Sequence, residues 1–229
     1  MGRIGVVVPA AGTGQRMGGR KKVFLELAGE PILRYTLRPF IGHPHVEAIR
    51  VALPAGEASD PPSWLQDLDP RVKVVAGGAS RTESVYRALL ALPDGLEVGV
   101  VHDGARPFVT HEILERCVEV ARKGEGGVAG WPMVDTLKEV DASQQVVATP
   151  DRSRYWKAQT PQAFPLEQLL AAYRQSMERD FHPTDDSALF ARFGGTVRMV
   201  EGGAWNLKVT HPADLVLAEA LLKWKREDA

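Results

Sequence analysis

The chain has 229 residues, a length that suits one α/β domain. Hydrophobic residues make up 44% of it and charged residues 25%, as in ordinary globular proteins, and a formal net charge of −1 excludes a global basic field that would recruit nucleic acid. Cys117 is the single cysteine, which excludes an intrachain disulfide framework and a cysteine-built metal cluster.

Features of targeting are missing from the sequence. Residues 1–12 are too few and too interrupted by glycine for a secretory signal. Apolar runs stay well short of the roughly 18 residues that a membrane-spanning helix needs. With the single cysteine, these features predict a cytoplasmic protein without a membrane partner.

Six short apolar runs, most of them rich in valine, predict strands along the chain. They span residues 4–10, 46–53, 72–78, 98–104, 126–132 and 195–202. Helical patterns lie between several of them, at 31–42, 80–92 and 110–124, with Pro31 in a first turn and Ser80 and Thr110 as caps. This alternation predicts an α/β fold with a mainly parallel sheet covered by helices, and functional residues just after the strands.

Residues 134–159 break the alternation. Two short alternating stretches flank a turn-like VDASQQ segment, which predicts a β-hairpin arm that projects from the sheet. A solvated loop is the alternative, although long structureless loops are uncommon in compact domains. Helices at 165–180 and 183–194, a strand at 205–210 and a last helix at 211–227 are then expected, and without a linker the whole of 1–229 forms one domain.

Glycines and cations crowd the loop after the first predicted strand. They are Gly12, Gly14, Gly18 and Gly19, and Arg16, Arg20, Lys21 and Lys22. Glycine turns let backbone N–H groups approach phosphates closely. The dinucleotide fingerprint fails at Met17, and the P-loop fails after Gly19, because Arg20 and Lys21 follow where a lysine and a hydroxyl are needed. The excess charge suits a triphosphate and nucleotidyl transfer, with a solvated basic loop as the alternative.

The motif PAAGTGQRM at 9–17 resembles the nucleotidyltransferase signature of sugar-phosphate pyrophosphorylases. Six further stretches, GGASRTESV, VHDGARPFV, VDTLK, DRSRYWKAQTPQAF, TDDSAL and NLKVT, extend the likeness to residue 210. Together they resemble the 2-C-methyl-D-erythritol 4-phosphate cytidylyltransferase family of the non-mevalonate isoprenoid pathway. The resemblance implies a single Rossmann-like nucleotidyltransferase domain, an enzyme that joins CTP to methylerythritol phosphate and releases pyrophosphate, with Mg²⁺ as cofactor.

The resemblance also assigns site residues. The nucleotide would contact Pro9, Ala10, Ala11, Gly12, Thr13, Gly14, Gly78, Ala79 and Ser84. Catalytic charge would come from Arg16, Lys22 and Lys208. The acceptor would contact Asp103, Arg106, Thr136, Arg152, Thr160 and Thr184, with Asp103 also a candidate metal ligand. The family often carries Asp at the position of Ala79, so a backbone contact there fits this chain and a carboxylate contact does not.

Several of these residues have structural alternatives. Asp103 and Arg106 follow a buried strand, where each needs a partner, and an ion pair between them would satisfy both. Asp103 as a ligand of Mg²⁺ or of substrate hydroxyls stays open. His102 is predicted to be a packed histidine, and Lys208 would be ordinary on an exposed edge strand.

The resemblance implies that the arm clasps the arm of a second subunit, with Arg152 reaching the partner's site. A lone hairpin is marginal in water, which independently favours a homodimer of two-fold symmetry. A surface ion pair is the alternative for Arg152. Three other functions stay open: a ribitol 5-phosphate cytidylyltransferase, a dinucleotide-dependent oxidoreductase disfavoured by Met17, and a non-catalytic nucleotide sensor.

Overall fold

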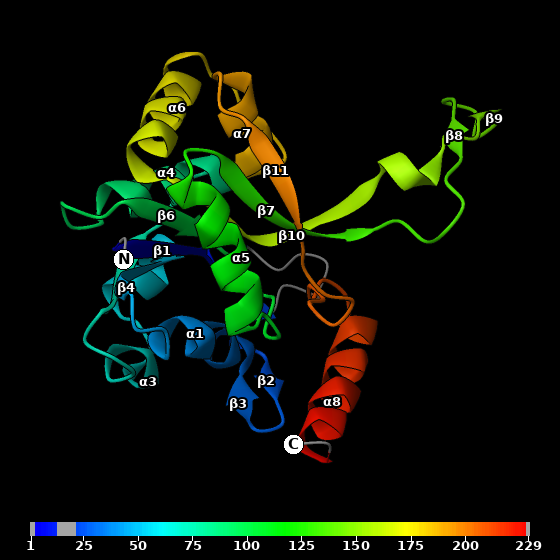
Figure 1. Ribbon diagram of the computed structural model, residues 1–229. Helices are drawn as coiled ribbons and strands as arrows, with labels where there is room; N and C mark the ends of the chain where they lie inside the picture. Colours follow the sequence, from blue (N-terminus) through cyan, green and yellow to red (C-terminus); the bar gives the residue numbers. More distant parts are fainter. Residues whose placement is uncertain (1–2, 13–21, 228–229) are drawn as a thin grey trace.

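A computed structural model describes residues 3–12 and 22–227, and the side chains of 3–12 and 23–225 (Figure 1). Within these ranges one seven-stranded sheet runs in the order β11-β7-β10-β6-β1-β4-β5. Its strands are β1 (Ile4–Pro9), β4 (Val46–Leu53), β5 (Val72–Ala76), β6 (Val98–Val101), β7 (Gly126–Pro132), β10 (Trp156–Pro165) and β11 (Val197–Glu201). Six of these strands fall on the six predicted runs, and β10 was not predicted.

The sheet is mixed but mostly parallel. Strand β1 pairs in parallel with β4 and β6, β4 with β5, and β7 with β11. Strand β10 alone among them runs antiparallel, against both β6 and β7. The predicted α/β class is therefore confirmed, with one reversed strand inside the sheet.

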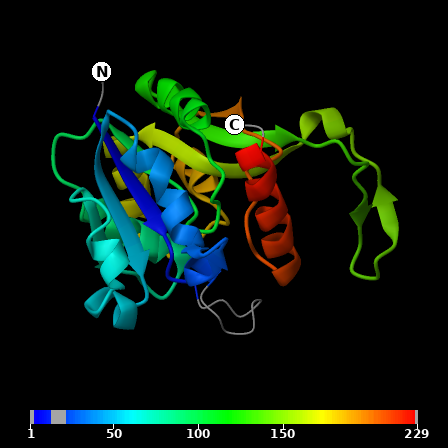
Figure 2. The same cartoon turned by 90° about the horizontal axis from the view of Figure 1, so that it is seen from below.

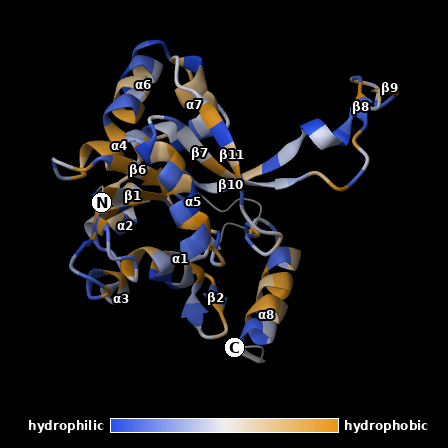
Figure 3. Ribbon diagram, viewed as in Figure 1, coloured by the Kyte–Doolittle hydropathy of each residue, from blue (hydrophilic) through white to orange (hydrophobic). Residues whose placement is uncertain are grey.

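Helices cover both faces of the sheet because its central strands are buried on both sides. Val6 and Val8 of β1 pack towards α1 (Ile32–Ile41) and α5 (His111–Arg122), while Val7 packs towards the opposite face. That face carries α4 (Arg81–Leu90), α6 (Leu166–Glu178) and α7 (Asp186–Arg192). Figure 3 shows the resulting hydrophobic centre, where β1 and β6 are among the most strongly orange elements.

Capping side chains start two of the helices where the sequence predicts. The Ser80 hydroxyl accepts a hydrogen bond from the N–H of Glu83, and the Thr110 hydroxyl accepts one from the N–H of Ile113. Helix α1 begins one residue later than expected, since Pro31 is its cap rather than its first residue. These helix starts fix the loops that precede them, which lie at the carboxyl ends of the parallel strands.

Strand β10 contains an irregularity that matters for the site. Ala158 pairs with Gly130 but Gln162 pairs with Val128, so the strand carries extra residues between two paired segments. Thr160 lies in this bulge, next to the end of β6. Bulges of this kind aim a side chain away from the regular ladder.

The arm extends from the body, and the last helix lies beside the body (Figure 1, Figure 2). The arm carries the hairpin of β8 (Glu139–Val140) and β9 (Val146–Ala148) and the short helix η3 (Arg152–Arg154), so the predicted hairpin is present. Helix α8 (Pro212–Glu227) packs through Ala218 and Leu221 near the small hairpin of β2 (Glu26–Leu27) and β3 (Glu30–Pro31). No helix of the described residues has the length and apolar character to cross a membrane.

The remaining short elements are η2 (Lys22–Phe24), α2 (Ala55–Ser59) and α3 (Ser63–Gln66). The predicted strand at 205–210 is wrong, because this segment has no strand assignment. Its backbone bonds to a loop instead: the N–H of Val209 donates to the carbonyl of Ala105 at 2.8 Å. The segment thus crosses the end of β6 rather than extending the sheet.

Candidate functional site

A pocket of about 310 Å³ lies beyond the carboxyl ends of β1, β5 and β6. Strand order reverses around β1, which has β4 on one side and β6 on the other, and such a switch point is where open α/β sheets bind ligands. The described lining comprises Pro9, Ala10, Ala11, Gly12, Val23, Gly78, Ala79, Ser80, Arg81, Ser84, Asp103, Gly104, Ala105 and Lys208. The pocket therefore lies where the strand pattern places it.

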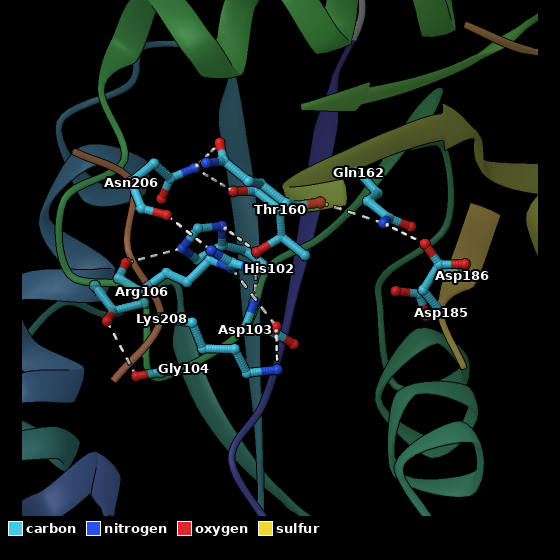
Figure 4. A network of polar contacts seen from close by, with 12 residues as sticks. His102, Asp103, Gly104, Arg106, Thr160, Gln162, Asp185, Asp186, Asn206 and Lys208 are labelled. Atoms are coloured by element: carbon cyan, nitrogen blue, oxygen red, sulfur yellow. Dashed lines mark hydrogen bonds and ion pairs between the residues drawn. The ribbon is translucent and has the colours of Figure 1, made fainter. Parts of the chain in front are cut away.

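Asp103 is the charged centre of this pocket (Figure 4). Its Oδ2 lies 2.7 Å from Lys208 Nζ and 3.8 Å from Arg106 Nε, and its Oδ1 accepts from Arg81 Nη2 at 3.3 Å. Burial alone would raise the pKa of Asp103, but the nearby charges of Arg81 and Lys208 hold it well below the usual range. The carboxylate is thus ionised at neutral pH and surrounded by cations.

Arg81 joins this centre to helix α7. Its Nη1 and Nη2 donate to the two oxygens of Asp186 at 3.0 and 2.7 Å, and Asp186 is fully buried. Tyr173, also buried, donates its hydroxyl proton to the same carboxylate. Burial would lower the pKa of Arg81, but Asp186 and Asp103 outweigh it and raise that pKa. Arg81 is therefore a fixed cation on the pocket wall.

A chain of hydrogen bonds fixes the backbone of Asp103 from behind. The N–H of Asp103 donates to Thr160 Oγ1 at 3.0 Å, and that hydroxyl lies 3.1 Å from His102 Nδ1. His102 Nε2 lies 3.1 Å from the carbonyl of Arg106, which can only accept, so Nε2 carries the proton and Nδ1 accepts from Thr160. His102 is fully buried, which confirms the predicted packed histidine, and burial lowers its pKa to about 4, so it is neutral at pH 7.

Amide side chains hold the segment that carries Lys208. Arg106 Nη1 donates to the carbonyl of Asn206 at 2.7 Å. Asn206 Nδ2 donates to the carbonyl of Thr160 at 2.8 Å and to Gln159 Oε1 at 3.2 Å. These bonds tie the 202–210 segment to the β10 bulge and to the loop after β6, which brings Lys208 to Asp103. Arg106, whose side chain is 11% exposed, thus acts within the framework and keeps its pairing with Asp103.

The turn between β5 and α4 forms the opposite wall. The N–H of Gly78 donates to Ser84 Oγ at 3.0 Å, and Ser84 Oγ donates to the carbonyl of Ser80 at 2.8 Å. The N–H of Ala79 donates to Glu83 Oε2 at 2.7 Å. Gly78, Ala79 and Ser84 therefore line the pocket with a turn whose shape is set by its own hydrogen bonds.

Other predicted residues lie elsewhere. Thr136 and Arg152 are exposed on the arm, where Arg152 Nη1 donates to the carbonyl of Val134 at 2.6 Å. Thr184 is exposed ahead of α7, and Thr160 is buried with its hydroxyl engaged internally. Thr13, Gly14 and Arg16 lie outside the described residues, and Lys22 is described only as the first backbone residue of η2.

Sequence reasoning missed Arg81 and Asp186. Both lie inside the motifs GGASRTESV and TDDSAL, but each follows a helix-capping residue, where a charged side chain is typical of an ordinary first helical turn. One feature of the sequence could have indicated them: each is a charged residue at the start of a helix, next to a segment that borders the predicted site. Only the fold brings the two residues, 105 positions apart, into contact.

The side chains of the pocket suit a metal ion that is coordinated mainly by a bound substrate rather than by the protein. Among the described residues no group of three His, Cys, Asp or Glu side chains is arranged to hold a metal ion. Asp103 is the carboxylate of the described pocket lining, and Lys208 and Arg81 contact its two oxygens. Mg²⁺ usually takes one or two carboxylates and completes its shell with waters and substrate phosphates, so these residues fit that arrangement, in which Asp103 would be the protein ligand.

Comparison with known proteins gives one family. The sequence profile described as 2-C-methyl-D-erythritol 4-phosphate cytidylyltransferase matches residues 4–224. A protein of that name from Synechococcus elongatus is 40% identical, covering 96% of this chain and 97% of the relative. One from Symbiobacterium thermophilum is 41% identical, with coverages of 96% and 93%.

Solved structures agree. The crystal structure of 2-C-methyl-D-erythritol 4-phosphate cytidylyltransferase from Thermus thermophilus superposes with a TM-score of 0.81 at 34% identity, covering 96% of this chain and 99% of that one. A 4-diphosphocytidyl-2C-methyl-D-erythritol synthase from Anaerococcus prevotii gives 0.86 at 28% identity, with coverages of 97% and 99%. The profile match, the full-length relatives and the shared fold show that the chain is a nucleotidyltransferase enzyme and belongs to the 2-C-methyl-D-erythritol 4-phosphate cytidylyltransferase family.

Proposed function

We propose that the chain joins CTP to 2-C-methyl-D-erythritol 4-phosphate, giving 4-diphosphocytidyl-2-C-methyl-D-erythritol and pyrophosphate, in isoprenoid precursor biosynthesis. The observation that carries this is the pocket at the ends of β1, β5 and β6, which combines a glycine-bearing loop, a structured turn and the Lys208–Asp103–Arg81 group in a chain of this family. The glycine-bearing loop receives the triphosphate, and the turn at 77–80 receives the base.

Alignment and charge neutralisation supply the catalysis. The acceptor phosphate is already ionised at neutral pH, so no protein nucleophile or base is needed to activate it. Its oxygen forms a bond to the α-phosphorus of CTP as the bond to the pyrophosphate oxygen breaks, and the electron pair leaves with pyrophosphate. Lys208, oriented by Asp103 at 2.7 Å, stabilises the negative charge on the phosphorus oxygens.

The charges of the described pocket require a further source of cations. Arg81, Arg106 and Lys208 face Asp103 and Asp186, which leaves a single positive charge in excess. A nucleoside triphosphate brings about four negative charges, each phosphate oxygen preferring charged donors. Arg16 and Lys22 therefore remain our candidates for the balance, with Thr13 and Gly14 in the same phosphate-binding loop.

Mg²⁺ bound to the nucleotide would neutralise charge on the triphosphate and the departing pyrophosphate. Asp103 is the residue that would hold it, by exchanging a contact with Lys208 or Arg81 for the cation. The rest of the coordination would come from phosphate oxygens and water.

The acceptor is held by residues of two copies of the chain. Asp103 and Thr184 lie on the body. Arg106 holds the segment that carries Lys208 in place, and the Thr160 hydroxyl holds the backbone of Asp103. Thr136 and Arg152 lie on an arm that leads away from the body of its own chain (Figure 1). In the proposed homodimer Arg152 therefore binds the acceptor phosphate in the partner's site, and Thr136 contacts the polyol of the acceptor. The dimer acts in the cytoplasm without nucleic acid or membrane partners.

One assay tests the reaction, base and acceptor together. Pyrophosphate release is measured with CTP, UTP, ATP and GTP, each with methylerythritol phosphate or ribitol 5-phosphate and Mg²⁺. We expect release with CTP and methylerythritol phosphate above all other pairs. Preference for ribitol 5-phosphate would replace the proposed acceptor, and CTP binding without pyrophosphate release from any pair would contradict the proposed reaction.

A further inference from the structure

The amide of Ala79, on the pocket wall, is held by a side chain from the next helix. Glu83 Oε2 accepts a hydrogen bond from the N–H of Ala79 at 2.7 Å. Glu83 lies in the first turn of α4, where its own N–H donates to the capping hydroxyl of Ser80 at 3.0 Å. The side chain therefore folds back over the turn that precedes its helix.

Arg87 completes this arrangement one helical turn later. Its Nη2 donates to Glu83 Oε1 at 2.5 Å, and its Nη1 donates to the carbonyl of Gly77 at 2.8 Å. Glu83 and Arg87 thus grip the turn at two points, the carbonyl of Gly77 and the amide of Ala79. We call these two residues the Glu83–Arg87 clamp.

The fit between the clamp and the turn explains Gly78. A Cβ built on Gly78 would lie 2.3–2.4 Å from the carboxyl end of Glu83, too close for any real contact. Glycine therefore lets the carboxylate cross the turn and reach Ala79. On the other side, a Cβ on Gly77 would lie 2.7 Å from the Cβ of Ala11, so the turn packs directly against the loop after β1.

Stability alone does not account for this pair. The side chains of Glu83 and Arg87 are 30% and 49% exposed, and ion pairs at that exposure contribute little to the free energy of unfolding. Both hydrogen bonds from the clamp nevertheless end on backbone atoms of a turn that lines the pocket. Holding a binding turn in its bound shape lowers the entropy lost when a ligand orders it.

We propose that Glu83 and Arg87 are positioning residues that set nucleotide affinity and base selectivity by holding the turn at 77–80. The proposal rests on the proposed function, in which this turn receives the cytosine base. Neither side chain belongs to the described lining of the pocket, so both act through the turn. Base discrimination requires donors and acceptors at fixed positions, because a mismatched polar group is penalised only when it cannot move to a new partner.

Glu83→Ala and Arg87→Ala test the proposal by steady-state kinetics. Each should raise the KM for CTP about tenfold, the effect of losing one charge-assisted hydrogen bond. The kcat should stay within about twofold and the KM for methylerythritol phosphate should not change, since the reacting groups lie elsewhere. The preference for CTP over UTP should fall by a similar factor. Glu83→Gln, which keeps an oxygen for Ala79 but not the charge for Arg87, should be intermediate.

A matched control exists at the far edge of the sheet. Arg198 on β11 donates to both carboxylate oxygens of Glu125, in the loop before β7, at 2.7 and 2.9 Å, and neither residue belongs to the described pocket lining. Glu125→Ala removes a comparable ion pair and should leave all kinetic constants unchanged. The double variant Glu83→Ala with Arg87→Ala should be about as impaired as either single one, because the two residues act as a unit.

Titration calorimetry with CTP alone separates this proposal from the reaction itself. Wild type that binds CTP, with Glu83→Ala binding about tenfold more weakly at an unchanged Tm, supports the clamp whether or not turnover is found. Wild-type turnover with unaltered CTP affinity and selectivity in Glu83→Ala overturns the clamp and leaves the function standing. Wild type that binds no CTP overturns both.

Discussion

Asp103 is the carboxylate around which the cationic side chains of the site gather. Its carboxylate accepts from Arg81, lies against Lys208 and has its backbone N–H held by Thr160. Arg81, Lys208 and Thr160 come from three different segments of the chain, so Asp103 reaches this position only when all three segments are folded around it.

Lys208→Met should lower kcat/KM by about 10²–10³, as expected when a charged group that stabilises the transition state is lost. The fold should persist because Lys208 is about one-third exposed and Asp103 keeps its contact with Arg81. Steady-state kinetics and circular dichroism check the two parts. Lys73→Met, an exposed lysine on β5, is the matched control, and equal activity of the two variants would remove Lys208 from the mechanism.

Arg81→Met should destabilise the protein by about 3 kcal/mol, because it leaves the Asp186 carboxylate buried without its cation. Urea unfolding measures the change. Adding Asp186→Asn to Arg81→Met should recover part of the loss, since the amide keeps an acceptor for Tyr173 and carries no charge. Strictly additive losses would show that Arg81 and Asp186 do not stabilise each other.

His102 predicts a pH dependence of stability. Its pKa is about 4 in the folded protein against an ordinary 6.5, so between these values the unfolded chain binds more protons. The free energy of unfolding should therefore fall as the pH drops from 6.5 to 4, by about 3 kcal/mol for this group, and be unaffected by it above 6.5. Urea titrations at pH 7, 6 and 5 should show a shallower slope for His102→Gln. Identical slopes would contradict the neutral, buried state.

At the level of elements, the sequence was sufficient where one physical signal dominated. The strand β4 coincides with its predicted run, Val46–Leu53, because every residue in it except Glu47 and Arg50 is buried and apolar. Ser80 and Thr110 cap helices as predicted, because a hydroxyl before an amphipathic run has few other uses. The pocket also lies at the strand ends that this alternation indicates.

The wrong or missed predictions share a cause. At these positions tertiary contacts, rather than the local sequence pattern, determine the structure. Strand β10 carries Pro161 and a bulge, so its sequence lacks the uninterrupted pattern of a strand, yet β6 and β7 pair with it on both sides. Residues 205–210 have that pattern, but Asn206 bonds to the β10 bulge and Val209 bonds to the loop after β6. Arg81 and Asp186 were missed for the same reason, since only tertiary contact distinguishes them from helix-start charges.

The arm exposes apolar side chains that no other part of the described chain covers. Val134, Val140, Val146 and Val147 are between half and two-thirds exposed on it, and β8 and β9 form only a short ladder. Short isolated hairpins gain too little burial to be stable in water, so a second chain that covers these valines would stabilise the arm. The two-copy site proposed for the acceptor requires the same contact.

Val140→Lys with Val147→Lys should therefore shift the protein from dimer to monomer, because two charges would be buried against an apolar partner surface. Analytical ultracentrifugation measures the mass. The KM for methylerythritol phosphate should rise in the monomer while the affinity for CTP in calorimetry stays the same, since in the proposed dimer the partner supplies Arg152 but not the nucleotide pocket. Leu90→Lys, an equally exposed apolar position on α4, should keep both the dimer and the KM. A wild-type monomer with full activity would show that each chain builds its acceptor site alone.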